Sequence, residues 1–302
     1  MINIDQTKFY RIQNQVSGKY LLAGSWGKST SDKLVWQYTL NQENTNSYYD
    51  LDGFLWQIVP DGNGYCRIIN KVSGFQLLAG SWGKVSTDKA VWQYALTDSN
   101  TNSLYDPDGF LWRIDDQGNI INKVSGMYLL AGSWGNNLSD NYVWQYALND
   151  GLPNSNFNAN GFHWSLLPFS EVPTKTIYVS RNGQSNNIKL RDSENHTGQS
   201  DNNGNLDDIT TSANYGNAVI WEIDPNDSPA SIYSLNGISK KGNSPADLLV
   251  SHPVAYNGQY QATIARDPSL NNKIETYNIS YQIDSSGPVL ERDPKLKLDP
   301  LS

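Results

Sequence analysis

The feature of this sequence that most restricts its fold is a block of 22 residues that occurs three times. The copies begin at Ser17, Ser73 and Ser125, which are separated by 56 and 52 residues, and each contains Leu-Leu-Ala-Gly-Ser-Trp-Gly and then Val-Trp-Gln-Tyr. A shorter block with Gly-Phe and a later Trp starts in the same register at Asp52, Asp108 and Asn160. Nine of the ten tryptophans fall at three equivalent positions per copy, so we predict three equivalent structural units.

Each copy predicts four short strands rather than helices. Apolar runs of strand length alternate with Gly-Ser, Asn-Gly and Asp-Gly pairs, which are typical of turns. One four-stranded copy cannot bury its apolar face alone, so the three copies must share one core. We therefore expect an all-β domain of about twelve strands.

Charge and composition exclude several classes of function. The net charge is −8, and acidic residues outnumber basic ones both before and after residue 170, which argues against a nucleic-acid or anionic-membrane partner. No apolar run is long enough to form a transmembrane segment. The first residues lack the pattern of a signal peptide, so we expect cytoplasmic synthesis, with later release from the cell left open.

The repeated residues resemble the ricin-B-type β-trefoil lectin family, in the style of the mushroom and bacterial trefoil lectins. The similarity lies in the strand after Ser-Gly, the later aromatic strand and the final x-x-Trp strand. It implies an N-terminal β-trefoil over residues 1–168, with repeats at about 7–60, 61–114 and 115–168. It also implies a lectin with up to three similar glycan sites, and glycans or glycoproteins as partners.

The family's usual sugar-binding residues are replaced in all three repeats. The position of its aspartate is occupied by Leu22, Leu78 and Leu130, and Gly-Phe stands where the family has Asn-Gln. We therefore do not expect galactose recognition by the usual geometry.

A different set of residues could recognise a sugar, because an aromatic face covers the apolar side of the ring and a carboxylate or amide bonds its hydroxyls. The candidate carbohydrate-binding residues are Trp26, Asp32, Trp36, Gln37, Tyr38, Trp82, Asp88, Trp92, Gln93, Tyr94, Trp134, Asp140, Trp144, Gln145 and Tyr146. Two alternatives stay open: the tryptophan of Val-Trp-Gln-Tyr could belong to the core, and the three aspartates could close turns. The last tryptophan of each repeat, at positions 56, 112 and 164, is expected in the core.

The second half carries no trace of the repeat. Residues 169–174 read as a linker, and alternating segments such as Thr-Tyr-Asn-Ile-Ser-Tyr-Gln-Ile predict an antiparallel β-sandwich over 175–302, immunoglobulin-like or cupredoxin-like. The three histidines lack metal-type spacing and the single cysteine, Cys66, lies in the first half. We therefore expect no enzyme activity, no metal and no cofactor.

The favoured function is a multivalent carbohydrate-binding protein. The alternative is a glycan-targeted toxin or defence protein whose C-terminal domain oligomerises or forms a pore. A homodimer through the C-terminal domain also remains open, as does a trefoil that binds a protein partner.

Overall fold

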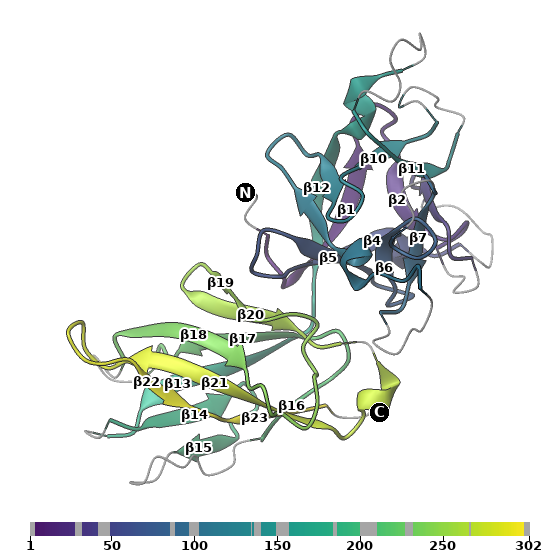
Figure 1. Ribbon diagram of the computed structural model, residues 1–302. Coiled ribbons are helices and arrows are strands. Elements are labelled where there is room, and N and C mark those ends of the chain that lie inside the picture. The colour runs from purple at the N-terminus through teal and green to yellow at the C-terminus, as the bar shows by residue number, and fades with distance from the viewer. Residues whose placement is uncertain are drawn as a thin grey trace. The chain divides into compact units, whose positions relative to one another are not determined.

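The computed structural model describes residues 4–27, 32–41, 49–84, 88–96, 103–133, 135, 140–148, 157–183, 186–199, 210–226, 232–265 and 267–298. The chain divides into two compact units, Met1–Glu171 and Val172–Ser302 (Figure 1). The regular elements of the described residues are β-strands and four short 3-10 helices. Among these residues, no helix has the length and apolar character needed to cross a membrane.

The first unit contains twelve strands, four in each repeat, as the sequence predicted. Repeat 1 has β1 (Lys8–Asn14), β2 (Tyr20–Ala23), β3 (Val35–Tyr38) and β4 (Leu55–Pro60). Repeat 2 has β5 (Cys66–Asn70), β6 (Gln76–Ala79), β7 (Val91–Tyr94) and β8 (Trp112–Ile114). Repeat 3 has β9 (Ile120–Asn122), β10 (Tyr128–Ala131), β11 (Val143–Tyr146) and β12 (Trp164–Glu171).

The register of the strands repeats with the sequence. The hairpins β2–β3, β6–β7 and β10–β11 are antiparallel, and each places the alanine of Leu-Leu-Ala opposite the valine of Val-Trp-Gln-Tyr. Strand β12 pairs with β1, so the last strand of repeat 3 meets the first strand of repeat 1. Three equivalent hairpins and this closing pair give the three-fold arrangement that the sequence predicted.

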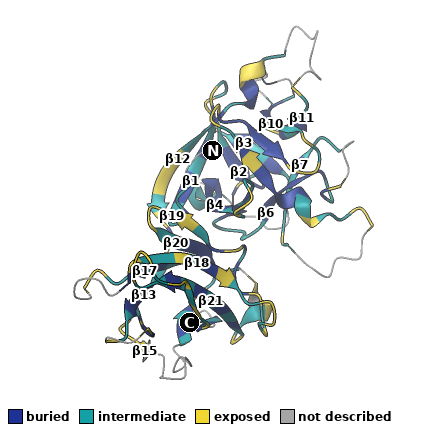
Figure 2. Ribbon diagram, turned by 60° about the vertical axis from the view of Figure 1, so that its left-hand side comes forward, coloured by how far each residue is buried: buried dark blue, intermediate teal, exposed yellow. Residues whose placement is uncertain are grey.

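The last tryptophan of each repeat lies in the core, as expected. Trp56, Trp112 and Trp164 are at most 1% exposed. Figure 2 shows that the strands of the first unit carry buried segments. Each indole N–H donates to a backbone oxygen on the second strand of its own repeat, at 3.1, 3.0 and 3.0 Å; the acceptors are Leu21, Leu77 and Leu129. These bonds satisfy the one polar atom that each buried indole carries.

A close approach of two glycines explains why both repeated blocks contain one. In repeat 1, a Cβ atom added to Gly53 would lie 2.3 Å from the Cα of Gly27. Gly27 also has a φ of +84°, which disfavours residues with side chains. The pairs Gly83–Gly109 and Gly135–Gly161 meet in the same way. These contacts hold the loop that follows the second strand against the 3-10 helices η1 (Leu51–Phe54), η2 (Pro107–Phe110) and η3 (Ala159–Phe162).

The second unit consists of two sheets around one core. One sheet has the order β15 (Thr197–Gln199), β14 (Ile188–Asp192), β13 (Thr174–Arg181), β17 (Ala218–Ile223), β20 (Gln259–Thr263) and β19 (Val254–Tyr256). The other has β16 (Thr210–Ala213), β23 (Lys295–Leu298), β21 (Ile274–Gln282) and β18 (Ser234–Lys240), with β22 (Leu290–Arg292) beside β21. A short 3-10 helix, η4 (Pro268–Leu270), precedes β21. Both sheets contribute buried residues to the shared core, including Trp221 and Tyr277, whose rings meet edge to face.

The expectation of a purely antiparallel second unit was wrong for two strand pairs. Strands β13 and β17 run parallel, and so do β16 and β23. Alternation of apolar residues reports which face of a strand is buried but not its direction, so the sequence could not show this. The residues 169–174 that we expected as a linker hold the end of β12, the dipeptide Val172–Pro173 and the first residue of β13.

Candidate functional site

The strands that carry Val-Trp-Gln-Tyr lie where neighbouring repeats meet. The backbone N–H groups of Gln37, Gln93 and Gln145 each donate at 2.7 Å to a carbonyl in the preceding repeat; the acceptors are Asn141, Lys33 and Lys89. Repeat 1 is thus bonded to repeat 3, repeat 2 to repeat 1 and repeat 3 to repeat 2. The three hairpins form a closed ring of backbone contacts around the three-fold axis.

The three glutamine side chains strengthen this ring and are not available to a ligand. Each is 0% exposed. Each amide N–H donates to an aspartate carbonyl of the preceding repeat, at 3.0, 3.2 and 2.9 Å, in Asp140, Asp32 and Asp88 respectively. Each amide oxygen accepts from a serine hydroxyl of its own repeat, in Ser17, Ser73 and Ser125. Because each amide is buried and is bonded at both its nitrogen and its oxygen, its geometry argues against a sugar contact for Gln37, Gln93 and Gln145.

The three aspartates fasten the loop of each hairpin. The carboxylate of Asp32 accepts from the backbone N–H groups of Ser25 and Leu34 at 2.8 and 3.0 Å. Asp88 holds Ser81 and Ala90 in the same manner at 2.7 and 3.0 Å. In repeat 3 the carboxylate of Asp140 accepts from the hydroxyl of Ser133 and the backbone N–H of Tyr142.

Each of these carboxylates also fixes an indole ring. Trp36, Trp92 and Trp144 donate their ring N–H to Asp32, Asp88 and Asp140 at 3.0, 3.2 and 3.2 Å. Three accepted hydrogen bonds per carboxylate favour the interpretation of these aspartates as turn braces. Each aspartate would then contribute to a ligand site by holding the indole ring that it bonds in place.

The tryptophans of Val-Trp-Gln-Tyr are half-buried at the junctions between repeats. Trp36 stacks on Tyr142 of repeat 3, with ring centroids 4.3 Å apart and planes at 30°. Trp92 and Trp144 form isolated β-bridges with Leu34 and Ala90 of the preceding repeats. The structure therefore places this tryptophan between core and surface, where it supports the neighbouring tyrosine.

A second pair of aromatic rings forms a partly exposed wall in repeats 1 and 2. Trp26 and Tyr38 lie with ring centroids 6.3 Å apart and planes at 27°, and Trp82 and Tyr94 repeat this geometry at 6.3 Å and 24°. Trp26 is 37% exposed, which suits a ring that receives a ligand. Trp134, the equivalent residue of repeat 3, lies outside the described residues, while Tyr146 occupies the position of the tyrosines.

A pocket of about 210 Å³ lies against this wall in repeat 2. The residues that line it include Lys33, Phe75, Leu78, Trp82, Tyr94, Tyr105 and Phe110. Leu78 is the residue that replaces the family's aspartate, so the pocket has an apolar residue at that position. The volume lies below the roughly 300–1,000 Å³ typical of drug-sized ligands, so it fits one small ring or substituent.

The structure adds a lysine that the sequence did not single out. The ammonium group of Lys33, from repeat 1, lies 3.6 Å from the ring centroid of Phe75 and 5.8 Å from that of Tyr94. Burial lowers the pKa of Lys33, and burial raises the pKa of Tyr94. The only signal for Lys33 in the sequence is its place directly after the aspartate, and nothing there shows that it crosses to the next repeat.

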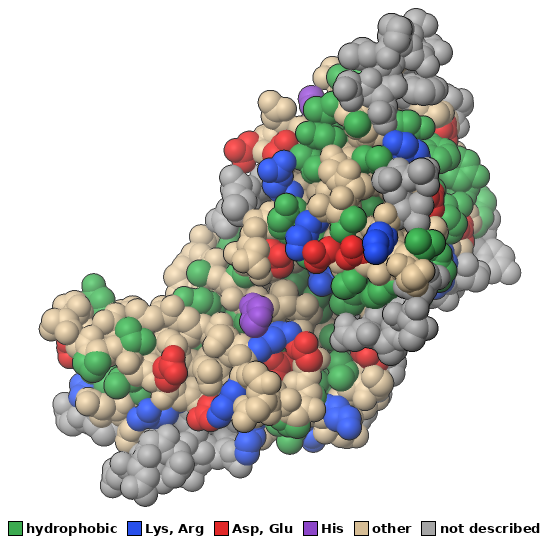
Figure 3. All heavy atoms as spheres, viewed as in Figure 1, with side chains coloured by type: hydrophobic (Ala, Val, Ile, Leu, Met, Phe, Trp, Pro, Cys, Tyr) green, Lys and Arg blue, Asp and Glu red, His purple; other side chains and the backbone are tan. Residues whose placement is uncertain are grey.

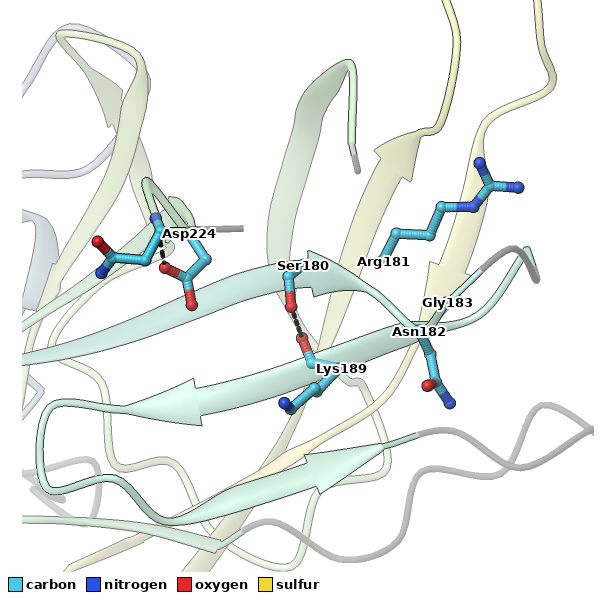
Figure 4. A pocket seen from close by; sticks show the side chains of 7 residues that line it. Ser180, Arg181, Asn182, Gly183, Lys189 and Asp224 are labelled. Carbon is cyan, nitrogen blue, oxygen red and sulfur yellow. Dashed lines mark hydrogen bonds between the residues drawn. The ribbon is translucent and has the colours of Figure 1, made fainter. Parts of the chain in front are cut away.

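The second unit contains a different kind of pocket. It measures about 380 Å³ and is lined by Ser180, Arg181, Asn182, Gly183, Lys189, Asp224 and Asn226 (Figure 4). Its carboxylate, Asp224, is bonded through both oxygens to Arg191. The lining offers hydrogen-bonding groups but no aromatic wall.

One group of metal-ligand residue types also occurs in this unit. Within the described parts of the chain, Asp192, Glu194 and His196 bring their ligand atoms within 4.8 Å of one another. One oxygen of Asp192 accepts from the backbone N–H groups of Glu194 and His196, and the other lies 2.9 Å from Nδ1 of His196. The carboxylate of Asp192 therefore closes the turn between β14 and β15.

Acidic and basic side chains are mixed on the face of the first unit that Figure 3 draws. On the face drawn in Figure 3, the acidic groups of the first unit lie beside Lys and Arg rather than in a separate area. The pairs Lys71–Asp52 and Lys123–Asp108, both at 2.8 Å, are equivalent exposed ion pairs in successive repeats. The described residues on this face form no continuous basic stripe of the kind that binds nucleic acid.

The first unit is similar to known proteins. Residues 3–94 match the family model described as "Ricin-type beta-trefoil lectin domain-like". No curated protein matches the chain. Solved structures similar to this chain include a designed three-fold symmetric protein, ThreeFoil, with 25% identity, a TM-score of 0.39 and coverage of 53% of this chain and 99% of its own.

Two natural proteins have lower sequence identity to this chain. An exo-β-1,3-galactanase from Clostridium thermocellum has 22% identity and a TM-score of 0.40, over 55% of this chain and 31% of its own. The cytolethal distending toxin of Haemophilus ducreyi has 16% identity and a TM-score of 0.36, over 56% and 87%. The family match confirms the resemblance seen in the repeats: the chain carries a ricin-type β-trefoil lectin domain-like region over residues 3–94.

Proposed function

We propose that the first unit is a multivalent carbohydrate-binding module with one site per repeat. The observation that carries this proposal is the pocket of about 210 Å³ in repeat 2, which lies against the stacked pair Trp82 and Tyr94. Aromatic faces of this kind cover the apolar C–H side of a pyranose ring.

The same wall occurs in repeat 1 through Trp26 and Tyr38, and the ring of backbone contacts gives the repeats equivalent environments. Sites of this size bury little area, so each one alone should bind weakly. Two or three of them on one rigid unit would raise avidity for a glycan-coated surface by about 10²–10⁴ where the spacing permits.

We propose binding without catalysis. The described lining of the pocket includes one lysine and several aromatic rings but no pair of carboxylates. A glycosidase of the usual kind needs two carboxyl groups that flank the scissile bond. The nearby Asp88 already accepts three hydrogen bonds from its own loop, which supports a structural role.

A glycan array with the full chain tests the proposal. We expect binding to a restricted set of glycans, with a large loss when Trp26→Ala and Trp82→Ala are combined. Tyr233→Ala is the matched control, because Tyr233 is 60% exposed in the second unit and should not alter binding. An array without signal, or a signal that the double variant keeps in full, would contradict the proposal.

A further inference from the structure

The three repeats differ in the pair of residues that meets at each junction between repeats, and the difference is compensated. The position that Lys33 occupies in repeat 1 is Lys89 in repeat 2 and Asn141 in repeat 3. The position that faces it in the following repeat is Phe75 in repeat 2 and Met127 in repeat 3, but Lys19 in repeat 1.

Contacts show that these two positions meet at each junction. Lys33 lies over Phe75 at 3.6 Å, and Lys89 lies 3.5 Å from the sulfur of Met127. At the third junction Lys19 donates to the side-chain oxygen of Asn141 at 2.7 Å. Each junction therefore holds one ammonium group, although in repeat 1 it comes from the opposite side of the contact.

At two of the three junctions the lysine lies beside the wall tyrosine of the site, and at the third it is linked to that tyrosine through Asn141. Lys33 lies 5.8 Å from the ring of Tyr94, and Lys89 lies 5.2 Å from that of Tyr146. At the junction of repeats 3 and 1, Asn141 bonds both Lys19 and the hydroxyl of Tyr38. Burial raises the pKa of Tyr38, and the bond to Asn141 lowers it by a smaller amount. Lys19 itself has a lowered pKa because of burial, while Asp140 acts in the opposite direction.

Recent duplication explains why equivalent positions hold identical residues. It does not explain why the third junction also holds one lysine when that lysine comes from the opposite side of the contact. Because burial lowers the pKa of Lys19 and of Lys33, keeping a charge there costs free energy. The neighbouring aspartates are engaged by their own loops, as Asp88 is by Ser81, Ala90 and Trp92. The ammonium group of Lys33 is thus the charged group in the described lining of the repeat 2 pocket.

We infer that these sites take acidic saccharides, in which a pyranose ring carries a carboxylate or sulfate group. The ring would stack on Tyr38, Tyr94 or Tyr146, and the anionic group would face the lysine of the same junction. This inference rests on the proposed carbohydrate function and specifies its ligand class.

Binding of paired monovalent sugars to the full chain provides the test. The carboxylate arm compares methyl glucuronide with methyl glucoside, and the sulfate arm compares galactose 6-sulfate with galactose. We expect the charged member of at least one pair to bind about five- to tenfold more tightly in low salt, an advantage that shrinks as salt is added. Equal or weaker binding of both charged members would overturn the inference while leaving the carbohydrate function intact. No binding of any of the four would also overturn the inference, and the glycan array then decides the carbohydrate function separately.

Lysine variants make the test specific. Lys33→Met keeps the apolar stem and removes the charge, so the anion preference should fall in part, and the triple variant with Lys19→Met and Lys89→Met should lose it. Lys71→Met, which breaks an exposed ion pair with Asp52, is the matched control and should keep the preference. A folded triple variant that keeps the full preference would overturn the inference; if that variant unfolds, the salt dependence of the unaltered protein decides.

Discussion

Replacing Asp88 by alanine should weaken the first unit rather than only remove a ligand contact. The carboxylate of Asp88 accepts hydrogen bonds from the backbone of Ser81 at 2.7 Å, from the backbone of Ala90 at 3.0 Å and from the indole of Trp92 at 3.2 Å. Hydrogen bonds to a charged group contribute about 1.5–3 kcal/mol each. Because the site is only half-buried, water replaces part of this, and we expect a net loss of about 2–4 kcal/mol.

Urea unfolding followed by tryptophan fluorescence measures this loss, since nine of the ten tryptophans lie in the first unit. With a slope of about 2 kcal/mol/M, the midpoint should fall by roughly 1–2 M. Asp88→Asn keeps one acceptor oxygen, so its unfolding midpoint should lie between that of the unaltered protein and that of Asp88→Ala. Asp108→Ala is the control, because its exposed ion pair with Lys123 should contribute less than about 1 kcal/mol. If the midpoints of Asp88→Ala and Asp108→Ala fall by similar amounts, the role of Asp88 in fastening its loop is refuted.

Three further outcomes follow from the same contacts. Gln93→Leu keeps the volume but removes the hydrogen bonds that the amide makes with the carbonyl of Asp32 and the hydroxyl of Ser73. Urea unfolding should therefore show a loss of about 1–3 kcal/mol, and no measurable loss would contradict the role of Gln93 in the ring. Gly109→Ala would place a Cβ 2.3 Å from the backbone of Gly83 and should lower the melting temperature. Gly126 has a φ of +65° but open space around it, so Gly126→Ala should lower the melting temperature less. A larger effect for Gly126→Ala would contradict the close approach of the two glycines. Binding of an acidic sugar should weaken as pH rises through the lowered pKa of Lys33, because the ammonium loses its charge while burial, which raises the pKa of Tyr94, keeps that phenol protonated. Calorimetry from pH 7 to 10 that shows no decline in affinity would contradict this.

The repeat allowed most of the first unit to be predicted from sequence. Equivalent tryptophans at positions 56, 112 and 164 had to share one core because a single repeat cannot bury them, and they do. The second unit was harder, since alternating apolar residues reveal strands but not their direction. The parallel pair β13–β17 therefore escaped prediction.

The candidate site was predicted in part. The aromatic residues were recognisable because their chemistry suits a sugar, and Trp82 and Tyr94 do line a pocket. The sequence does not show that the side chain of Gln93 turns toward the preceding repeat, where its amide bonds a backbone carbonyl and has little access to a ligand. Lys33 was missed for the same reason, since its neighbours come from the next repeat. Residues that act across a junction between repeats leave no local signal.

Stoichiometry with a monovalent saccharide, measured by calorimetry on the full chain, tests the central claim most directly. One site per repeat predicts roughly three ligands per chain, and a chain with Trp82→Ala should bind about one fewer while the remaining sites keep their affinity. A single ligand per chain, or a stoichiometry that does not change when Trp82 is replaced, would contradict the assignment of the sites to the repeated aromatic walls.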